Sequence, residues 1–110
     1  MSFQHKELAA GRWKTFSFVE QMAHIGSEVE RALNWKAKND AEYSRMAFER
    51  ALELLDLTLD AHTSGPRLKE VARVREALVD YFAGANEFGS NEQLWKNYFL
   101  AFTYAARRGH

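Results

Sequence analysis

The sequence predicts an all-α fold: an antiparallel up-down-up-down four-helix bundle with a short N-terminal extension. The chain has one proline, and glycine is sparse inside its long segments. Valine, isoleucine and threonine do not form the alternating runs that mark strands. Capping signals divide the chain into four segments joined by short loops, and short loops place neighbouring helices antiparallel. We expect residues 17–110 to form one domain on which residues 1–16 pack.

The first helix is expected to begin after Ser17. The stretch S-F-V-E is a capping box, with Ser17 as N-cap and Glu20 at the third helical position. The helix should end near residues 36–38, because lysines suit a helix C-terminus. Apolar residues at spacings of three and four form a single stripe along it: Phe18, Met22, Ile25, Val29 and Leu33.

The second helix is expected to begin at Asn39 or Asp40 and to end near His62. Glu42 is placed for a capping box with Asn39. On a helical wheel the apolar residues of this segment cover about two thirds of the circumference, more than a surface helix needs. We therefore expect this helix to be central or to be covered by a second chain.

The third helix is expected to run from Pro66 or Arg67 to Ala83. Proline suits the first helical turn, and the stretch T-S-G-P separates this helix from the one before. Gly84 follows as a left-handed stop.

The fourth helix is expected to cover about residues 91–107. Ser90 is the predicted N-cap, and Gln93 completes a capping box with it. Arg107 and Arg108 lie at the C-terminal end, where the helix dipole favours cations.

The N-terminal extension gives a weaker pattern than the four helices. Gly11 interrupts a possible short helix, and the stretch W-K-T-F follows it. We expect these two aromatic rings to pack against the bundle.

Two arginines fall within apolar arcs. Arg50 lies in the arc of the second helix and Arg75 in the arc of the third. An unpaired buried charge costs several kcal/mol, so both need partners. Candidate partners are Glu28, Glu76, Asp80 and carboxylates of a second subunit. In the structural interpretation, each arginine extends past the edge of the arc or forms an ion pair. In the functional interpretation, the two arginines bind an anion or fix the register of a dimer.

Three aromatic or apolar side chains point away from the expected core. Leu100 and Tyr104 lie off the apolar face of the fourth helix, and Trp35 lies off the stripe of the first. One interpretation is that the N-terminal segment covers them. The other is an exposed interface for self-association or for a protein partner, since interfaces favour such residues.

Composition disfavours several classes of function. The net charge is zero, with 15 basic and 15 acidic residues and no basic block, which disfavours nucleic-acid binding. The chain has no cysteine, which excludes disulfides and thiol chemistry and fits a cytoplasmic protein. No segment approaches 18 apolar residues and the N-terminus has no signal-peptide core, so we expect neither a membrane span nor export.

The sequence carries no recognisable catalytic motif. A bundle di-metal site needs Glu-x-x-His on two helices, and this pattern does not occur. Glu20 with His24, and Asp56 and Asp60 with His62, lie off the expected core face. There is neither a nucleophile elbow nor a phosphate-binding loop. We therefore expect no metal, no cofactor and no enzymatic activity.

Two stretches resemble a known family. A-F-E-R-A-L-E-L-L at 47–55 and R-V-R-E-A-L-V-D-Y-F at 73–82 resemble small bacterial and archaeal helical bundles of the HEPN kind. That family includes ribonuclease toxins and partners of minimal nucleotidyltransferases. Its ribonucleases carry an arginine followed four to six residues later by a histidine, and no histidine of this chain follows an arginine at that spacing. The resemblance thus implies a helical bundle without a catalytic residue.

These observations predict a non-enzymatic prokaryotic protein that acts through protein–protein contacts as a homodimer. One alternative is a bundle that binds an anionic small molecule or nucleotide through Arg50 and Arg75. Another is a partner subunit of a minimal nucleotidyltransferase or of a toxin–antitoxin system.

Overall fold

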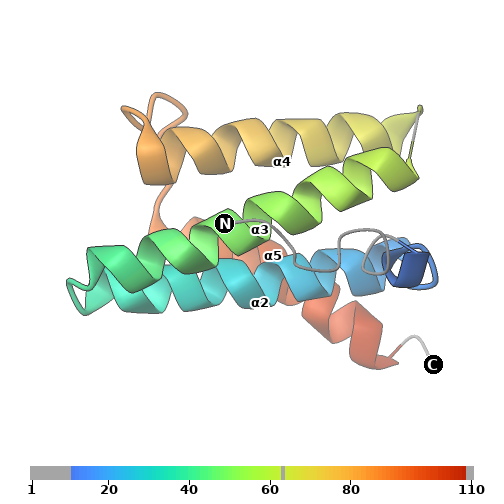
Figure 1. The fold of residues 1–110 in the computed structure, drawn as a ribbon, viewed down its shortest axis with the longest axis horizontal. Helices are drawn as coiled ribbons and strands as arrows, with labels where there is room; N and C mark the ends of the chain where they lie inside the picture. The colour runs from blue at the N-terminus through green and yellow to red at the C-terminus, as the bar shows by residue number, and fades with distance from the viewer. Residues whose placement is uncertain (1–10, 63, 109–110) are drawn as a thin grey trace.

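The computed structural model describes residues 11–62 and 64–108, and this part of the chain is helical apart from turns and loops (Figure 1). The predicted all-α class is therefore confirmed. Residues 11–13 are helical and precede four longer helices: α2 (Phe18–Ala37), α3 (Ala41–Ala61), α4 (Pro66–Ala83) and α5 (Glu92–Arg108).

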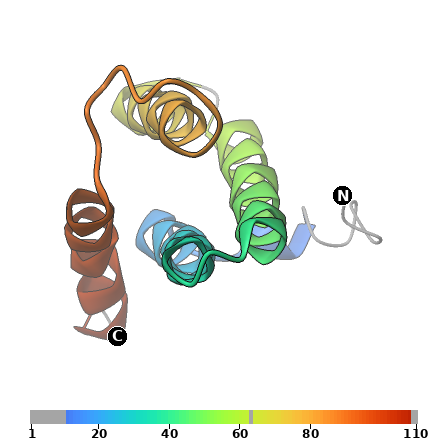
Figure 2. The ribbon, with the colours of Figure 1, turned by 90° about the vertical axis from the view of Figure 1, so that its left-hand side faces the viewer.

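Three of the helices lie lengthwise and the fourth crosses them. In Figure 1, α2, α3 and α4 run in alternating directions, whereas α5 passes behind α2 at a steep angle. The end view shows the helices around an arc, with residues 84–91 spanning the distance from α4 to α5 (Figure 2). The main packing pairs are α2 with α3, α2 with α5 and α3 with α4. The up-down-up-down bundle is therefore not confirmed, because α5 does not run beside α4.

The start of α2 is as predicted. The Ser17 hydroxyl accepts a hydrogen bond from the Glu20 N–H at 3.1 Å. The Glu20 carboxylate accepts one from the Ser17 N–H at 2.8 Å. Both halves of the capping box are therefore present, because this motif depends only on residues within one helical turn.

The start of α3 is at the second of the two predicted residues, Asp40, but the predicted capping box is absent. Asn39 has a φ of 62°, the left-handed conformation that ends the preceding helix. The N-cap is Asp40, whose carboxylate accepts a hydrogen bond from the Tyr43 N–H at 3.1 Å. A residue in the left-handed region cannot supply the extended backbone of an N-cap, so no capping box forms between Asn39 and Glu42.

The loop between α4 and α5 also differs from the prediction. Gly84 has a φ of −110°, so it is not a left-handed stop. Asn86 accepts a hydrogen bond from the Ser90 N–H at 2.9 Å. The N-cap of α5 is Asn91 instead of Ser90, since its side chain accepts from the Leu94 N–H at 2.9 Å. The predicted box of Ser90 with Gln93 is therefore wrong.

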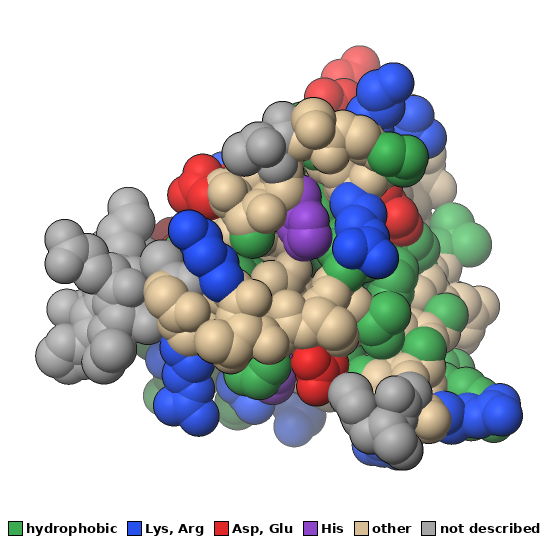
Figure 3. All heavy atoms as spheres, turned by 90° about the vertical axis from the view of Figure 1, so that its right-hand side faces the viewer, with side chains coloured by type: hydrophobic (Ala, Val, Ile, Leu, Met, Phe, Trp, Pro, Cys, Tyr) green, Lys and Arg blue, Asp and Glu red, His purple; other side chains and the backbone are tan. Residues whose placement is uncertain are grey.

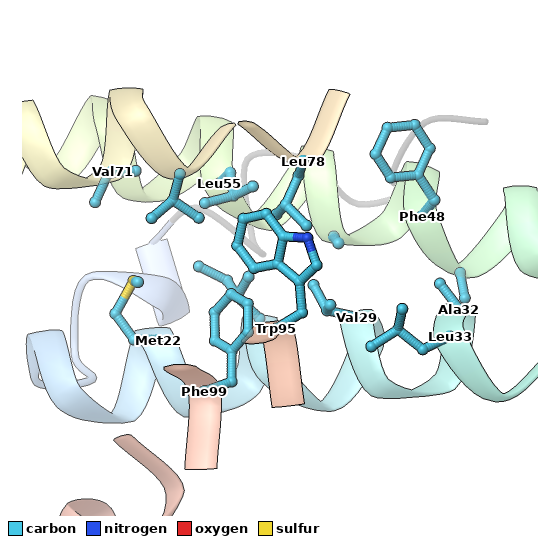
Figure 4. Packing of buried hydrophobic residues seen from close by; sticks show 14 of the residues in the cluster. Met22, Val29, Ala32, Leu33, Phe48, Leu55, Val71, Leu78, Trp95 and Phe99 are labelled. Atoms are coloured by element: carbon cyan, nitrogen blue, oxygen red, sulfur yellow. The ribbon is translucent and has the colours of Figure 1, made fainter. Parts of the chain in front are cut away.

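The core lies between α2, α3 and α4, with two side chains from α5 inserted into it (Figure 4). Met22 and Ile25 of α2, Leu55 of α3, and Val71 and Leu78 of α4 are fully buried. The burial of each large apolar side chain contributes about 1.5–3 kcal/mol to folding, so this layer supplies most of the stability.

The segment before α2 is held by a buried polar network. The Trp13 indole N–H donates to the Thr58 hydroxyl at 2.9 Å, and that hydroxyl donates to the Leu54 carbonyl at 2.8 Å. The Gln21 side-chain amide donates to the Trp13 carbonyl at 3.0 Å. Trp13 is buried and Phe16 is partly buried. The predicted packing of this W-K-T-F stretch is confirmed, while the prediction for residues 1–10 lies outside the described residues.

Candidate interaction surface

The outer face of α5 exposes large hydrophobic side chains. Leu94, Leu100 and Tyr104 are 54%, 62% and 58% exposed. Among the described residues, only Tyr43 and Phe88 are comparable in size and exposure. The outward orientation predicted for Leu100 and Tyr104 is confirmed. We call this surface the α5 outer face; it comprises Leu94, Asn97, Leu100, Ala101, Tyr104 and Arg108.

The spacing on this face is that of a helix–helix contact. Leu94, Asn97, Ala101, Tyr104 and Arg108 follow one another at alternating steps of three and four, and all five are exposed. Such spacing aligns residues along one side of a helix. In the space-filling view, hydrophobic side chains reach the surface on the side where α5 lies, near basic groups (Figure 3).

The inner face of α5 is anchored in the core by two aromatic side chains. Trp95 and Phe99 are 7% and 4% exposed. Figure 4 shows the Trp95 indole reaching between Val29 of α2 and Leu78 of α4. The indole N–H of Trp95 is buried and has no hydrogen-bond acceptor among the described residues.

A glycine allows α5 to approach α2 closely. A Cβ added to Gly26 would lie 2.8 Å from the Phe99 Cβ and 3.0 Å from two of its ring carbons. These distances are shorter than van der Waals contact allows, so the crossing of α2 and α5 requires glycine at this position. The position of α5, and therefore of its outer face, depends on this contact.

One polar contact joins α5 to α4. The Tyr98 hydroxyl donates to a carboxylate oxygen of Glu70 at 2.6 Å in a partly buried site. Burial is the main cause that raises the pKa of Tyr98 above its usual value, and the adjacent Glu70 carboxylate raises it further. Tyr98 therefore remains protonated and keeps donating to Glu70 throughout the physiological pH range.

We expect Tyr98→Phe to lower the free energy of unfolding by about 1–2 kcal/mol at pH 7, because it removes a hydrogen bond to a charged acceptor. A raised pKa in the folded state adds stability below the unfolded pKa of about 10, and this contribution is lost above it. The difference from wild type should therefore shrink as the pH rises above 10. Urea unfolding from pH 7 to 11 measures this, and a difference that stays constant across that range contradicts it.

The two arginines do not form a shared site. Arg50 is exposed, which agrees with the alternative that its side chain extends past the edge of the apolar arc and does not face the core. Arg75 is partly exposed, and its Nε forms an ion pair with Asp56 at 2.8 Å. A pair so exposed contributes about 0–1 kcal/mol. It links α4 to α3 and serves as a local structural contact.

The predicted partners of the arginines have other contacts. Glu28 pairs with Arg31, one turn along α2, at 2.6 Å. Asp80 accepts hydrogen bonds from the backbone N–H groups of Glu87 and Phe88 at 2.8 and 3.0 Å. Asp80 therefore organises the loop before α5 and does not pair with an arginine. The partner of Arg75 is Asp56, which the sequence analysis placed off the core face of its helix and did not consider as a partner.

Trp35 belongs to the corner between α2 and α3. It is partly buried, and its ring lies 4.9 Å from that of Tyr43. The Lys38 ammonium lies 5.1 Å from the Trp35 ring. Trp35 is thus covered by its own neighbours, so the outward patch consists of Leu100 and Tyr104 without it.

The described residues lack two features that other functions would need. In residues 11–62 and 64–108, no three acidic or histidine side chains gather closely enough to hold a metal ion. No helix in the same ranges is both long and apolar enough to cross a membrane.

Comparisons with protein-family models, with curated proteins and with solved structures found no match to this chain. The resemblance to HEPN-like bundles therefore stays a hypothesis that rests on the sequence pattern of α3 and α4. The functional argument depends on the surfaces described above.

Proposed function

We propose that this protein acts through protein–protein contacts and forms a homodimer in which α5 packs against α5 of a second copy. The observation that carries the proposal is the α5 outer face, where Leu94, Leu100 and Tyr104 are all more than half exposed. Burial of such side chains is favourable, and aromatic residues and arginine are enriched at interfaces.

Charge favours an antiparallel pair. Arg107 and Arg108 lie in the last turn of α5, and Glu92 lies in the first turn. Glu92 already pairs with Lys96 at 2.8 Å, so the arginines decide the orientation: an antiparallel arrangement places the two basic ends far apart, and it also opposes the two helix dipoles. Ala101 lies midway along the seam from Leu94 to Arg108, and its small side chain allows close approach at the two-fold axis.

The size of the face limits the affinity. A helix of 17 residues is about 25 Å long, so the pair buries less surface than an obligate dimer does. Association also costs several kcal/mol because two chains lose translational and rotational freedom, and this cost offsets part of the free energy gained by burying apolar surface. We therefore expect a dissociation constant in the micromolar range.

Glutamate at the α5 outer face should weaken self-association strongly. Leu100→Glu and Tyr104→Glu place like charges close together in the dimer, so each is expected to weaken dimerisation at least about tenfold. Sedimentation equilibrium over a concentration series measures this. Phe88→Glu is the matched control, because Phe88 is also about 60% exposed but lies outside α5. Equal effects of Leu100→Glu and Phe88→Glu contradict the proposal.

Cysteine cross-linking tests the antiparallel geometry. The chain has no cysteine, so Ala101→Cys introduces a single thiol. Near the two-fold axis this thiol should form an intermolecular disulfide readily. Leu94→Cys should not, because seven residues of helix on each side of the axis separate the two thiols by about 21 Å. Preferential cross-linking at Leu94 contradicts an antiparallel pair.

The alternative of an anion bound between Arg50 and Arg75 has no support from the geometry. Arg75 is paired with Asp56, and Arg50 does not line the cavity beside Arg75. The role of partner subunit for a nucleotidyltransferase or toxin has no specific observation in its favour.

A further inference from the structure

A groove of about 730 Å³ lies at the end of the molecule where α2 ends and α3 begins. In Figure 1, α3 and α4 lie close together at the turn that joins them and diverge toward the C-terminus of α4. No residue of α5 lines this groove, so it is separate from the α5 outer face. Its lining comes from the end of α2 and the turn after it, the first half of α3 and the end of α4: Lys36, Asn39, Ala41, Ser44, Arg45, Phe48, Glu49, Leu52, Phe82 and Ala83.

The lining is apolar on its α3 and α4 sides. Phe48 and Phe82 stack with their ring centroids 4.9 Å apart. Leu52, one turn after Phe48, and Ala83, next to Phe82, extend this surface. Together they give this side of the groove an aromatic and aliphatic lining, which suits the apolar body of a small molecule.

One cation of the groove, Lys36, has no acidic partner among the described residues. The Lys36 ammonium lies 4.5 Å from the centre of the Tyr81 ring and 5.8 Å from that of Phe82. Within the described part of the chain, no carboxylate lies within ion-pair distance of it. The other two charged residues of the lining, Arg45 and Glu49, pair with each other at 3.1 Å. The lining therefore carries an excess positive charge at Lys36.

We infer that this groove binds a small amphipathic monoanion. Its apolar body lies on Phe48, Leu52 and Phe82, and its carboxylate or sulfonate contacts the Lys36 ammonium. The volume lies within the range of small-molecule sites, about 300–1,000 Å³. On α3 the lining extends from Ala41 to Leu52, which is about 16 Å along the helix axis and suits a ligand of two fused rings or a chain of some ten carbons.

A pair of fluorescent probes separates charge recognition from apolar burial. The first is 8-anilinonaphthalene-1-sulfonate, which is anionic, and the second is the neutral N-phenyl-1-naphthylamine. We expect one anionic probe to bind per chain. Lys36→Met should lower the affinity for the anionic probe about fivefold and leave the affinity for the neutral probe unchanged. A partly exposed charge contact contributes on the order of this factor. The matched charge control is Lys69→Met, an exposed lysine on α4.

A second variant tests the location. Ala83 is exposed and lines the groove, so Ala83→Trp should fill it and abolish binding of both probes without disturbing the core. Ala72→Trp, at an exposed position on the same helix outside the groove, should leave binding unchanged. Circular dichroism confirms that each variant is folded. Unchanged binding to Ala83→Trp, equal weakening of both probes by Lys36→Met, or no binding at millimolar probe overturns the inference.

Discussion

Trp95→Ala should lower the free energy of unfolding by about 3–5 kcal/mol, as expected for truncation of a buried tryptophan. Trp95 is 7% exposed and packs between α2 and α4, so its loss leaves a cavity where α5 meets the core (Figure 4). Urea unfolding followed by far-ultraviolet circular dichroism measures the change. A loss below 1 kcal/mol would mean that α5 is not held by this side chain.

Leu94→Ala is the matched control, because Leu94 is the neighbouring residue on α5 and is 54% exposed. Its effect on the free energy of unfolding of the monomer should stay within about 0.5 kcal/mol. Trp95→Phe should lower the free energy of unfolding by less than the loss of side-chain volume alone implies. The buried indole N–H has no acceptor within the described residues, so phenylalanine also removes an unsatisfied donor.

Gly26→Leu should destabilise the protein by about 3 kcal/mol and displace α5. Even a single Cβ at Gly26 would lie 2.8 Å from the Phe99 Cβ, which is fixed to the backbone of α5 and cannot rotate away. Overpacking of this kind typically costs about 1–3 kcal/mol, and leucine adds more volume than alanine. Thermal unfolding measures the loss of stability.

Gly26→Ala separates packing from helix propensity. Alanine in a helix interior is favoured over glycine by about 1 kcal/mol, so the steric cost must exceed this gain for the variant to be destabilised. We expect a net loss of about 1 kcal/mol. Ser27→Ala, at the exposed neighbouring position, is the control and should be neutral. A stabilised Gly26→Ala variant would contradict the close crossing of α2 and α5.

The features that sequence reasoning predicted correctly are local. The capping box of Ser17 with Glu20 needs only residues within one turn, and the outward positions of Leu100 and Tyr104 follow from the helical period. Where two neighbouring polar residues could each serve as the N-cap, the sequence pattern does not show which one does. The sequence leaves Asn39 and Asp40 open for α3 and favours Ser90 for α5, whereas Asp40 and Asn91 form the caps because the loop conformation decides which residue can cap.

The errors arise where packing depends on distant elements. A helical wheel placed Arg50 in the wide apolar arc of α3, but it does not reveal which part of that arc α2 and α4 cover, and Arg50 is exposed. For the same reason the sequence does not indicate the ion pair of Arg75 with Asp56, which joins two different helices. The steep crossing of α5 depends on contact between Gly26 and Phe99, which no spacing in the sequence indicates.

The groove could not be predicted from the sequence either. Its residues come from three helices, α2, α3 and α4, and from the turn between the first two, which meet there only in the folded chain. In the sequence, Phe48 and Phe82 appear as ordinary core positions. Only their arrangement beside Lys36 indicates a binding surface.

Native mass spectrometry of the purified protein at a few micromolar tests the homodimer most directly. A species of twice the 12.7 kDa chain mass, lost in Leu100→Glu and retained in Phe88→Glu, is the predicted result. A single-chain mass at every concentration up to about 100 μM, well above the micromolar dissociation constant expected, would contradict self-association through α5.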